Sequence, residues 1–84
     1  MEELNELKRL IAISYGTEDK IFALHYYDRK QAQDALFEAF RIRVGFQGYV
    51  NLHREFLLSE GVPQDHIQEQ LKLVKDLARY FTED

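Results

Sequence analysis

Apolar residues recur every three or four positions along most of the chain, which is the spacing of one face of an α-helix. The N-terminal stripe consists of Leu4, Leu7, Leu10 and Ile11. It predicts a helix from about Glu2 to Ser14, which Gly16 ends because glycine accepts the left-handed conformation common after helices. The C-terminal stripe consists of Ile67, Leu71, Val74, Ala78 and Phe81. It predicts a helix that begins near Pro63, since proline suits a first helical turn.

The centre of the chain carries the longest periodic run. Asp28 with Gln31 three residues later resembles a capping box and marks a helix start. One wide apolar stripe then continues to about Ser59 through Ala32, Ala35, Ala39, Ile42, Phe46, Tyr49, Val50, His53 and Leu57. Gly45 and Gly48 interrupt this run, and each costs about 1 kcal/mol relative to alanine inside a helix. We expect one long helix, bent near Gly45–Gly48, although a break into two helices fits the same residues.

The segment Glu18 to Tyr27 permits two interpretations. Its aromatic residues favour a strand with Phe22, Leu24 and Tyr26 on one face. A lone strand in a helical domain would leave its backbone groups without partners. We therefore favour a short helix that buries Ile21, Leu24 and Tyr27 and has Thr17 at its N-cap.

A second apolar group lies on the other side of the central run and consists of Phe37, Phe40, Val44 and Leu58. A helix that is apolar on two sides is either the centre of its own bundle or part of a subunit contact, and both interpretations remain open here. The predicted fold is an all-α bundle of three to four helices in one domain, residues 1–84, with a long central helix and a C-terminal helical hairpin.

The amino-acid composition excludes several classes of function but does not assign one. The 84 residues include six Phe and five Tyr but no Cys, so disulfides and thiolate metal sites are excluded and a cytoplasmic location is expected. The net charge of −4 comes from mixed charges without a basic patch, which disfavours nucleic acid as a partner. We find neither a secretory signal nor an apolar run long enough to span a membrane.

No arrangement typical of catalysis or metal binding is found in the sequence. The stretch EELNE at residues 2–6 resembles half of the magnesium motif of all-α nucleotide pyrophosphohydrolases, but no Glu is followed by Asp three positions later, as that family requires. His53 lies on the main apolar stripe, so we expect a buried histidine with hydrogen-bond partners rather than a ligand or base. We predict neither an enzyme nor a cofactor or metal.

The turn between the last two helices raises a DNA-binding alternative. Residues 56–71, with Gly61 at the turn and Ile67 beyond it, have the outline of a helix-turn-helix motif. The early turns of the second helix carry Asp65 and Glu69, which would face phosphates unfavourably. A simple hairpin, in which Gly61 ends one helix and Pro63 starts the next, explains the same residues.

Protein binding is the function that these observations favour. The aromatic content and the two-sided central helix are typical of a small regulator, adaptor or inhibitor that forms a homodimer or docks on a larger protein. Tyr, Phe and Arg together are typical of binding hot spots, and they cluster in HYYDR at 25–29 and FRIR at 40–43. The predicted partner-binding residues are Tyr26, Tyr27, Arg29, Phe37, Phe40, Arg41, Arg43 and Val44.

Overall fold

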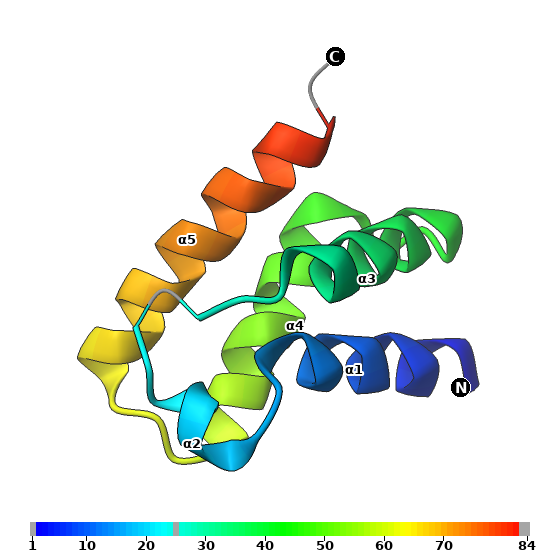
Figure 1. Ribbon diagram of the computed structural model, residues 1–84. Coiled ribbons are helices and arrows are strands. Elements are labelled where there is room, and N and C mark those ends of the chain that lie inside the picture. Colours follow the sequence, from blue (N-terminus) through cyan, green and yellow to red (C-terminus); the bar gives the residue numbers. More distant parts are fainter. Residues whose placement is uncertain (1, 25, 83–84) are drawn as a thin grey trace.

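The computed structural model describes residues 2–24 and 26–82, and all regular structure within these ranges is helical. The helices are α1 Glu2–Tyr15, α2 Glu18–Ile21, α3 Arg29–Arg41, α4 Gly45–Ser59 and α5 Gln64–Thr82 (Figure 1). The predicted all-α fold is therefore confirmed. A strand near residues 20–27 is not found in the described part of the chain.

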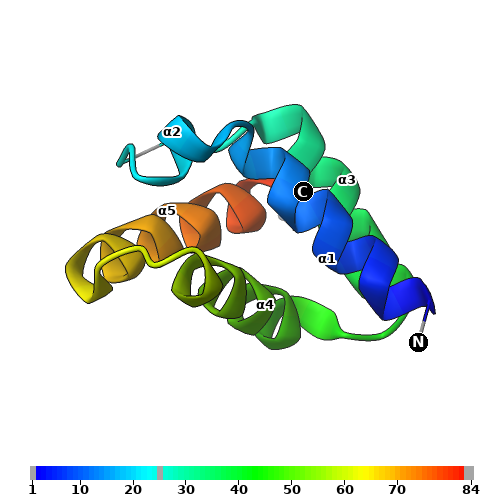
Figure 2. The ribbon, with the colours of Figure 1, turned by 90° about the horizontal axis from the view of Figure 1, so that it is seen from below.

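The four longer helices pack as two pairs. Helices α1 and α3 lie side by side and run in opposite directions, and α4 and α5 form a hairpin that packs across them (Figures 1 and 2). The core lies between the pairs and receives buried side chains from every helix. Its largest buried apolar members are Leu7, Ile11, Tyr15, Leu36, Tyr49, Val50, Leu57 and Val74.

Helices α1 and α5 begin and end close to where the apolar pattern predicts. The core-facing residues Ile67, Leu71, Val74 and Ala78 are all buried, as expected from their spacing. Phe81, the last predicted member of this stripe, lies outside the described side chains. The periodic pattern is reliable here because both helices bury one face and expose the other.

The single long helix predicted for residues 28–59 is wrong. Helix α3 ends at Arg41, and Arg43 takes a left-handed conformation with φ of 65°. The Val44 amide donates to the Ala39 carbonyl at 2.8 Å, and the Arg43 amide donates to the Phe40 carbonyl at 3.1 Å. These two bonds form a Schellman motif, which ends a helix by satisfying its last carbonyls. Gly45, with φ of 80°, then redirects the chain into α4.

The same type of termination produces the predicted C-terminal hairpin. Gly61 has a φ of 78°, and its amide donates to the Leu58 carbonyl at 3.1 Å. The Val62 amide donates to the Leu57 carbonyl, also at 3.1 Å, and the Val62 side chain is buried. The apolar contact that accompanies a Schellman motif therefore anchors the turn between α4 and α5.

Among the described residues between Glu18 and Asp28, only those of α2 are helical, so the helix predicted for residues 18–27 is found over its first four residues. Ile21 and Tyr27 are buried as predicted, but Leu24 is 43% exposed. Tertiary hydrogen bonds hold the segment after α2. The Asp28 amide donates to the Ser14 carbonyl at 2.9 Å, and Gln70 Nε2 donates to the Tyr26 carbonyl at 2.8 Å. Asp28 Oδ1 accepts from the Gln31 amide at 3.0 Å, which confirms the predicted N-cap of α3.

Candidate functional site

The outward face of α3 exposes two large aromatic side chains. Phe37 is 57% exposed and Phe40 is 49% exposed, while their neighbours Leu36 and Ala39 are buried in the core. At Phe37 and Phe40, the described part of the chain thus leaves the predicted second apolar face of this segment exposed. We call Phe37, Phe40 and the exposed charged residues of α3 the α3 surface.

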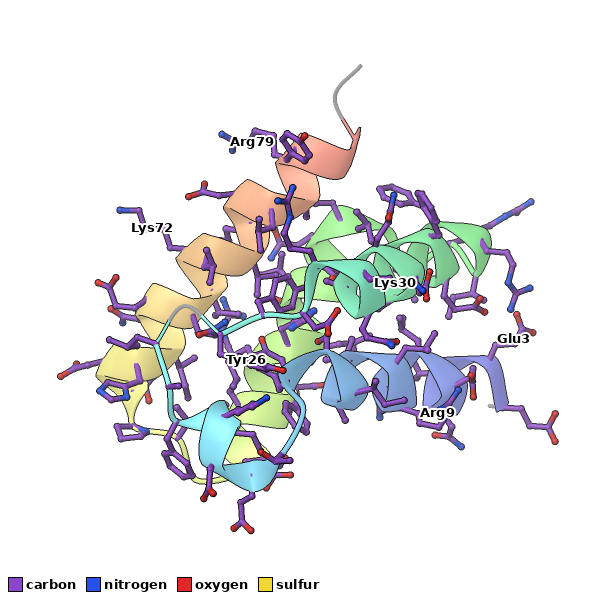
Figure 3. All side chains as sticks on the ribbon, viewed as in Figure 1. Glu3, Arg9, Tyr26, Lys30, Lys72 and Arg79 are labelled. Atoms are coloured by element: carbon purple, nitrogen blue, oxygen red, sulfur yellow. The ribbon has the colours of Figure 1, made fainter. Side chains whose placement is uncertain are left out.

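Two of the predicted partner-binding arginines lie on the α3 surface and are held by specific contacts. The Arg29 guanidinium lies over the Tyr80 ring of α5, 5.1 Å from its centroid. Arg41 donates through Nε to Glu38 Oε1 at 2.9 Å, and its Nη2 lies 3.7 Å from Glu3 Oε2. Hydrogen bonding and charge from Arg41 lower the pKa of the Glu38 carboxyl. Figure 3 shows Glu3 on α1 and Lys30 on the adjacent α3.

The other predicted partner-binding residues do not all reach this surface. Tyr27 is only 7% exposed and belongs to the core, so it is removed from the candidate binding residues. Val44 is half-buried against the core, and Arg43 is exposed in the turn after α3. Tyr26 is half-buried near α2, where Lys20 Nζ lies 4.8 Å from its ring centroid. His25, the first residue of the HYYDR stretch, lies outside the described residues.

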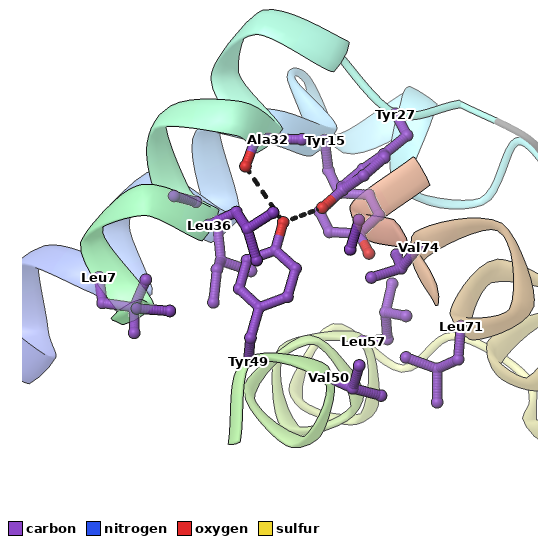
Figure 4. Close-up of a cluster of buried hydrophobic side chains, with 14 of the residues drawn as sticks. Leu7, Tyr15, Tyr27, Ala32, Leu36, Tyr49, Val50, Leu57, Leu71 and Val74 are labelled. Atoms are coloured by element: carbon purple, nitrogen blue, oxygen red, sulfur yellow. Dashed lines mark hydrogen bonds between the residues drawn. The ribbon is translucent and has the colours of Figure 1, made fainter. Parts of the chain in front are cut away.

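His53 is fully buried and bonded at both ring nitrogens, as predicted for a core histidine. The Tyr15 hydroxyl lies 2.7 Å from Nδ1, and the Tyr27 hydroxyl lies 3.2 Å from Nε2. The Tyr27 hydroxyl also bonds to the Tyr49 hydroxyl, which in turn lies 3.2 Å from the Ala32 carbonyl (Figure 4). We call Tyr15, Tyr27, Tyr49 and His53 the tyrosine–histidine network.

The Ala32 carbonyl fixes the direction of every hydrogen bond in this network. A carbonyl only accepts, so the Tyr49 hydroxyl donates to Ala32 and must accept from the Tyr27 hydroxyl. Tyr27 then has no proton left for His53, so His53 carries its proton on Nε2 and donates it to the Tyr27 oxygen. Nδ1 is the free acceptor, and the Tyr15 hydroxyl donates to it. The four protons thus satisfy the network in one arrangement.

Burial keeps the network neutral. Desolvation lowers the pKa of His53 from 6.5 to about 3 and raises the pKa of Tyr49 from 10.0 to about 12. The pKa values of Tyr15 and Tyr27 are also raised, chiefly by burial. The aromatic rings pack edge to face around the imidazole, with the Tyr49 centroid 4.5 Å from that of His53. The network thus holds a neutral imidazole inside the core, out of contact with solvent.

A shallow groove between α1 and α4 was not predicted from the sequence. Its volume is about 250 Å³, and it is lined by Lys8, Ile11, Leu52, Glu55, Phe56 and Ser59. Phe56 stacks on Tyr15 of the network, with 5.3 Å between ring centroids. The sequence signal was weak because the lining residues alternate between apolar and charged types on two separate helices.

The α4–α5 turn places mostly polar and acidic side chains on the outside of α5. Gln64, Asp65, Gln68 and Glu69 are exposed, whereas Gln70 is buried and donates to the Tyr26 carbonyl at 2.8 Å. Gln70 therefore makes its hydrogen bond inside the fold and is not available to read a base. The two carboxylates would approach a phosphate backbone without a compensating cation on the same turns.

Within residues 2–24 and 26–82, no group of three or more His, Cys, Asp or Glu side chains is arranged to hold a metal ion. No helix in the same ranges combines the length and the apolar character needed to cross a bilayer. The chain matches none of the protein-family models, curated proteins or solved structures with which it was compared.

Proposed function

We propose that this protein is a small non-catalytic regulator, adaptor or inhibitor that acts through protein–protein contacts and forms a homodimer. The observation that carries the proposal is the exposure of Phe37 and Phe40 beside arginines on one helix. Two neighbouring phenylalanines that stay about half exposed lose about half of the stabilisation that full burial of an aromatic ring provides. Covering them with a partner recovers that free energy.

The chemistry of the α3 surface supports the proposal further. Aromatic side chains surrounded by arginines are typical of interface hot spots, because the rings supply apolar area and the guanidinium groups supply oriented donors. Arg29 and Arg41 are already held by Tyr80 and Glu38, so less side-chain entropy is lost when a partner binds. His53 and three of the tyrosines are buried in the core, whereas Phe37 and Phe40 are exposed and can contact a partner.

The test compares Phe37→Gln and Phe40→Gln with Leu58→Gln as a matched control. Leu58 is 51% exposed at the end of α4, so its replacement removes a similar apolar area from a different surface. Sedimentation measures the oligomeric state across a wide concentration range, and affinity capture from source cells compares the proteins retained. We expect both phenylalanine variants to lose the dimer or a specific bound protein, while Leu58→Gln retains them.

The opposite results would overturn the proposal. A wild-type chain that stays monomeric at every concentration, and that captures the same proteins as Phe37→Gln, has no functional contact at α3. Salt-dependent binding to random duplex DNA at physiological ionic strength would instead favour the helix-turn-helix alternative over residues 56–71, because phosphate contacts produce that salt dependence.

A further inference from the structure

The residues of α3 that lie opposite the core follow a four-three-four spacing. Ala32, Ala35, Leu36 and Ala39 form the buried side. The stripe on the far side consists of Lys30, Asp34, Phe37 and Arg41, all of which are exposed. A four-three alternation places side chains in one line along a helix, and where such a line is apolar it forms the seam between the helices of a coiled coil. On α3 Phe37 is the apolar member of this line, and the other three members are charged. On α3 this seam is directed to solvent.

Two of the three charged residues on the seam flank its aromatic residue with opposite charges. Asp34 precedes Phe37 by one turn, and Arg41 follows it by one turn. In the described part of the chain, the Asp34 carboxylate forms no ion pair or hydrogen bond. Arg41 bonds to Glu38 and approaches Glu3, and the five N–H donors of a guanidinium allow it to bind a further carboxylate.

We propose that the partner of the α3 surface is the same helix of a second copy, packed antiparallel about a two-fold axis that passes near Phe37. This inference rests on the proposed homodimer and names its interface. In this arrangement the two Phe37 rings meet at the axis, and each Asp34 faces Arg41 of the other copy. A two-fold interface repeats every contact, so one complementary pair in the sequence produces two in the dimer.

Charge selects this orientation over the parallel one. Parallel alignment would place Asp34 against Asp34 and Arg41 against Arg41, and like charges opposed across an interface are unfavourable. The antiparallel alignment converts both into opposite-charge contacts. Lys30 then faces the turn after α3, near Val44 and the exposed Arg43, so this position adds no favourable charge contact. Phe40 lies beside the seam and extends the apolar contact around Phe37.

The size of the surface sets the expected affinity. Helix α3 has 13 residues and is therefore about 20 Å long. A single helix pair of this length is at the small end of specific interfaces. We therefore expect a concentration-dependent equilibrium between monomer and dimer, with a dissociation constant on the order of micromolar.

The experiment uses charge reversals in the full chain, with dissociation constants measured by sedimentation equilibrium. Asp34→Arg and Arg41→Asp each create two like-charge contacts in the dimer, so each should weaken self-association by at least about tenfold. The double variant restores opposite charges in reversed order and should return close to the wild-type value. Arg9→Asp, which breaks the exposed ion pair with Glu6 on α1, is the control and should leave self-association unchanged.

Mixing the two single variants provides a second measurement that does not depend on the double variant folding. In an Asp34→Arg chain both seam positions are positive, and in an Arg41→Asp chain both are negative. An equimolar mixture should therefore form a heterodimer, although each variant alone stays monomeric. Heterodimer formation also demonstrates that both variants are folded.

The outcomes separate this inference from the proposed function. If the wild type dimerises but the reversals change its dissociation constant by less than about twofold, the α3 seam is not the interface, although the homodimer remains. If the mixture of single variants stays monomeric while the wild type dimerises, the Asp34–Arg41 contact is refuted. A strictly monomeric wild type would refute the homodimer and this interface together.

Discussion

At the scale of single residues, the tyrosine–histidine network concentrates most of the buried polar chemistry of this small domain. Each member depends on the next, because Tyr15 donates to His53, His53 to Tyr27, Tyr27 to Tyr49, and Tyr49 to the Ala32 carbonyl. A buried polar group that loses its only partner costs more than the bond itself contributed. The members are therefore energetically coupled.

A double-mutant cycle measures this coupling. His53→Leu leaves the Tyr15 hydroxyl without its acceptor, and Tyr15→Phe leaves Nδ1 of His53 without its donor, so each should lower the free energy of unfolding by about 1–3 kcal/mol. The double variant removes both groups and should cost at least about 1 kcal/mol less than the sum of the two single changes. Urea unfolding of the four proteins provides the values. Additive losses would contradict the assigned hydrogen bond.

The same histidine makes stability depend on pH in a predictable direction. The folded-state pKa of His53 is about 3, whereas the unfolded chain protonates near 6.5. Below pH 6.5 the unfolded state therefore binds a proton that the folded state excludes, and stability falls as pH falls. Between pH 7.5 and pH 5 we expect the wild type to lose about 2 kcal/mol through this group.

The control for this pH effect is His53→Leu, which retains the other two histidines and all carboxyl groups. Its unfolding free energy should change by about 2 kcal/mol less than that of the wild type over the same interval. Arginine partners lower the pKa values of Glu6 and Glu38. These two carboxyl groups therefore stay ionised in the upper part of the interval from pH 5 to pH 7.5 and do not contribute to the change in stability there. Equal pH slopes for the two proteins would show that His53 is accessible to protons in the folded state.

At the scale of elements, the break between α3 and α4 depends on two residues with left-handed backbone conformations, and this conformation costs more free energy at one of them than at the other. Arg43 has a side chain that clashes with its own backbone in this conformation, whereas Gly45 has none. A glycine at the Arg43 position would be the usual way to end a helix with a Schellman motif. The arginine therefore destabilises the fold at a position where the chain direction requires a positive φ.

Replacing Arg43 by glycine and Gly45 by alanine should change the free energy of unfolding in opposite directions. Arg43→Gly should raise the free energy of unfolding by about 0.5–1 kcal/mol, because it removes the left-handed penalty at a small entropic cost. Gly45→Ala should lower it by about 1 kcal/mol or more. In the described part of the chain, no heavy atom beyond the adjacent residues and the nearby backbone of α4 lies within 4 Å of a Cβ added at Gly45, so the loss comes from backbone conformation. Thermal unfolding of both variants tests the pair.

The break between α3 and α4 could not be predicted from the apolar pattern of the sequence. The apolar period continues across residues 42–44, since Ala39, Ile42 and Phe46 all contact the core, so the pattern itself does not reveal two helices. The left-handed residue is an arginine, which carries no helix-ending signal. By contrast, Gly61 and Pro63 mark the second turn clearly, and this turn was predicted; in the structure the buried Val62 anchors it.

The candidate site was predictable only in part for a related reason. Local spacing placed Phe37 and Phe40 off the main stripe, and both are exposed. Tyr27 was predicted on the buried face of a short helix and also among the binding residues, because it lies beside Tyr26 and Arg29; contacts with Tyr49 and His53 bury it. Those partners lie 22 and 26 positions further along the chain, and periodicity within one segment carries no information about such pairings.

At the scale of the whole molecule, α3 takes part in both the core and the proposed interface, with Leu36 on one side and Phe37 on the other. Folding and self-association are therefore linked by mass action, and the dimer stabilises the folded chain. Above the dissociation constant, each tenfold increase in protein concentration should raise the thermal midpoint by about 3–6 °C. Scanning calorimetry of the wild type and Phe37→Gln checks this, and the midpoint of the variant should not depend on concentration.

The tyrosine–histidine network also constrains how this protein can diverge. Its members come from α1, the segment before α3, and α4, so no single stretch of sequence contains the whole network. A substitution at one member leaves a buried group unsatisfied, and only a compensating change at another member relieves it. The four positions should therefore be inherited together. Related chains that share this core are expected to retain all four residues or to have replaced several of them at once, which makes the combination a more useful marker of ancestry than overall sequence identity.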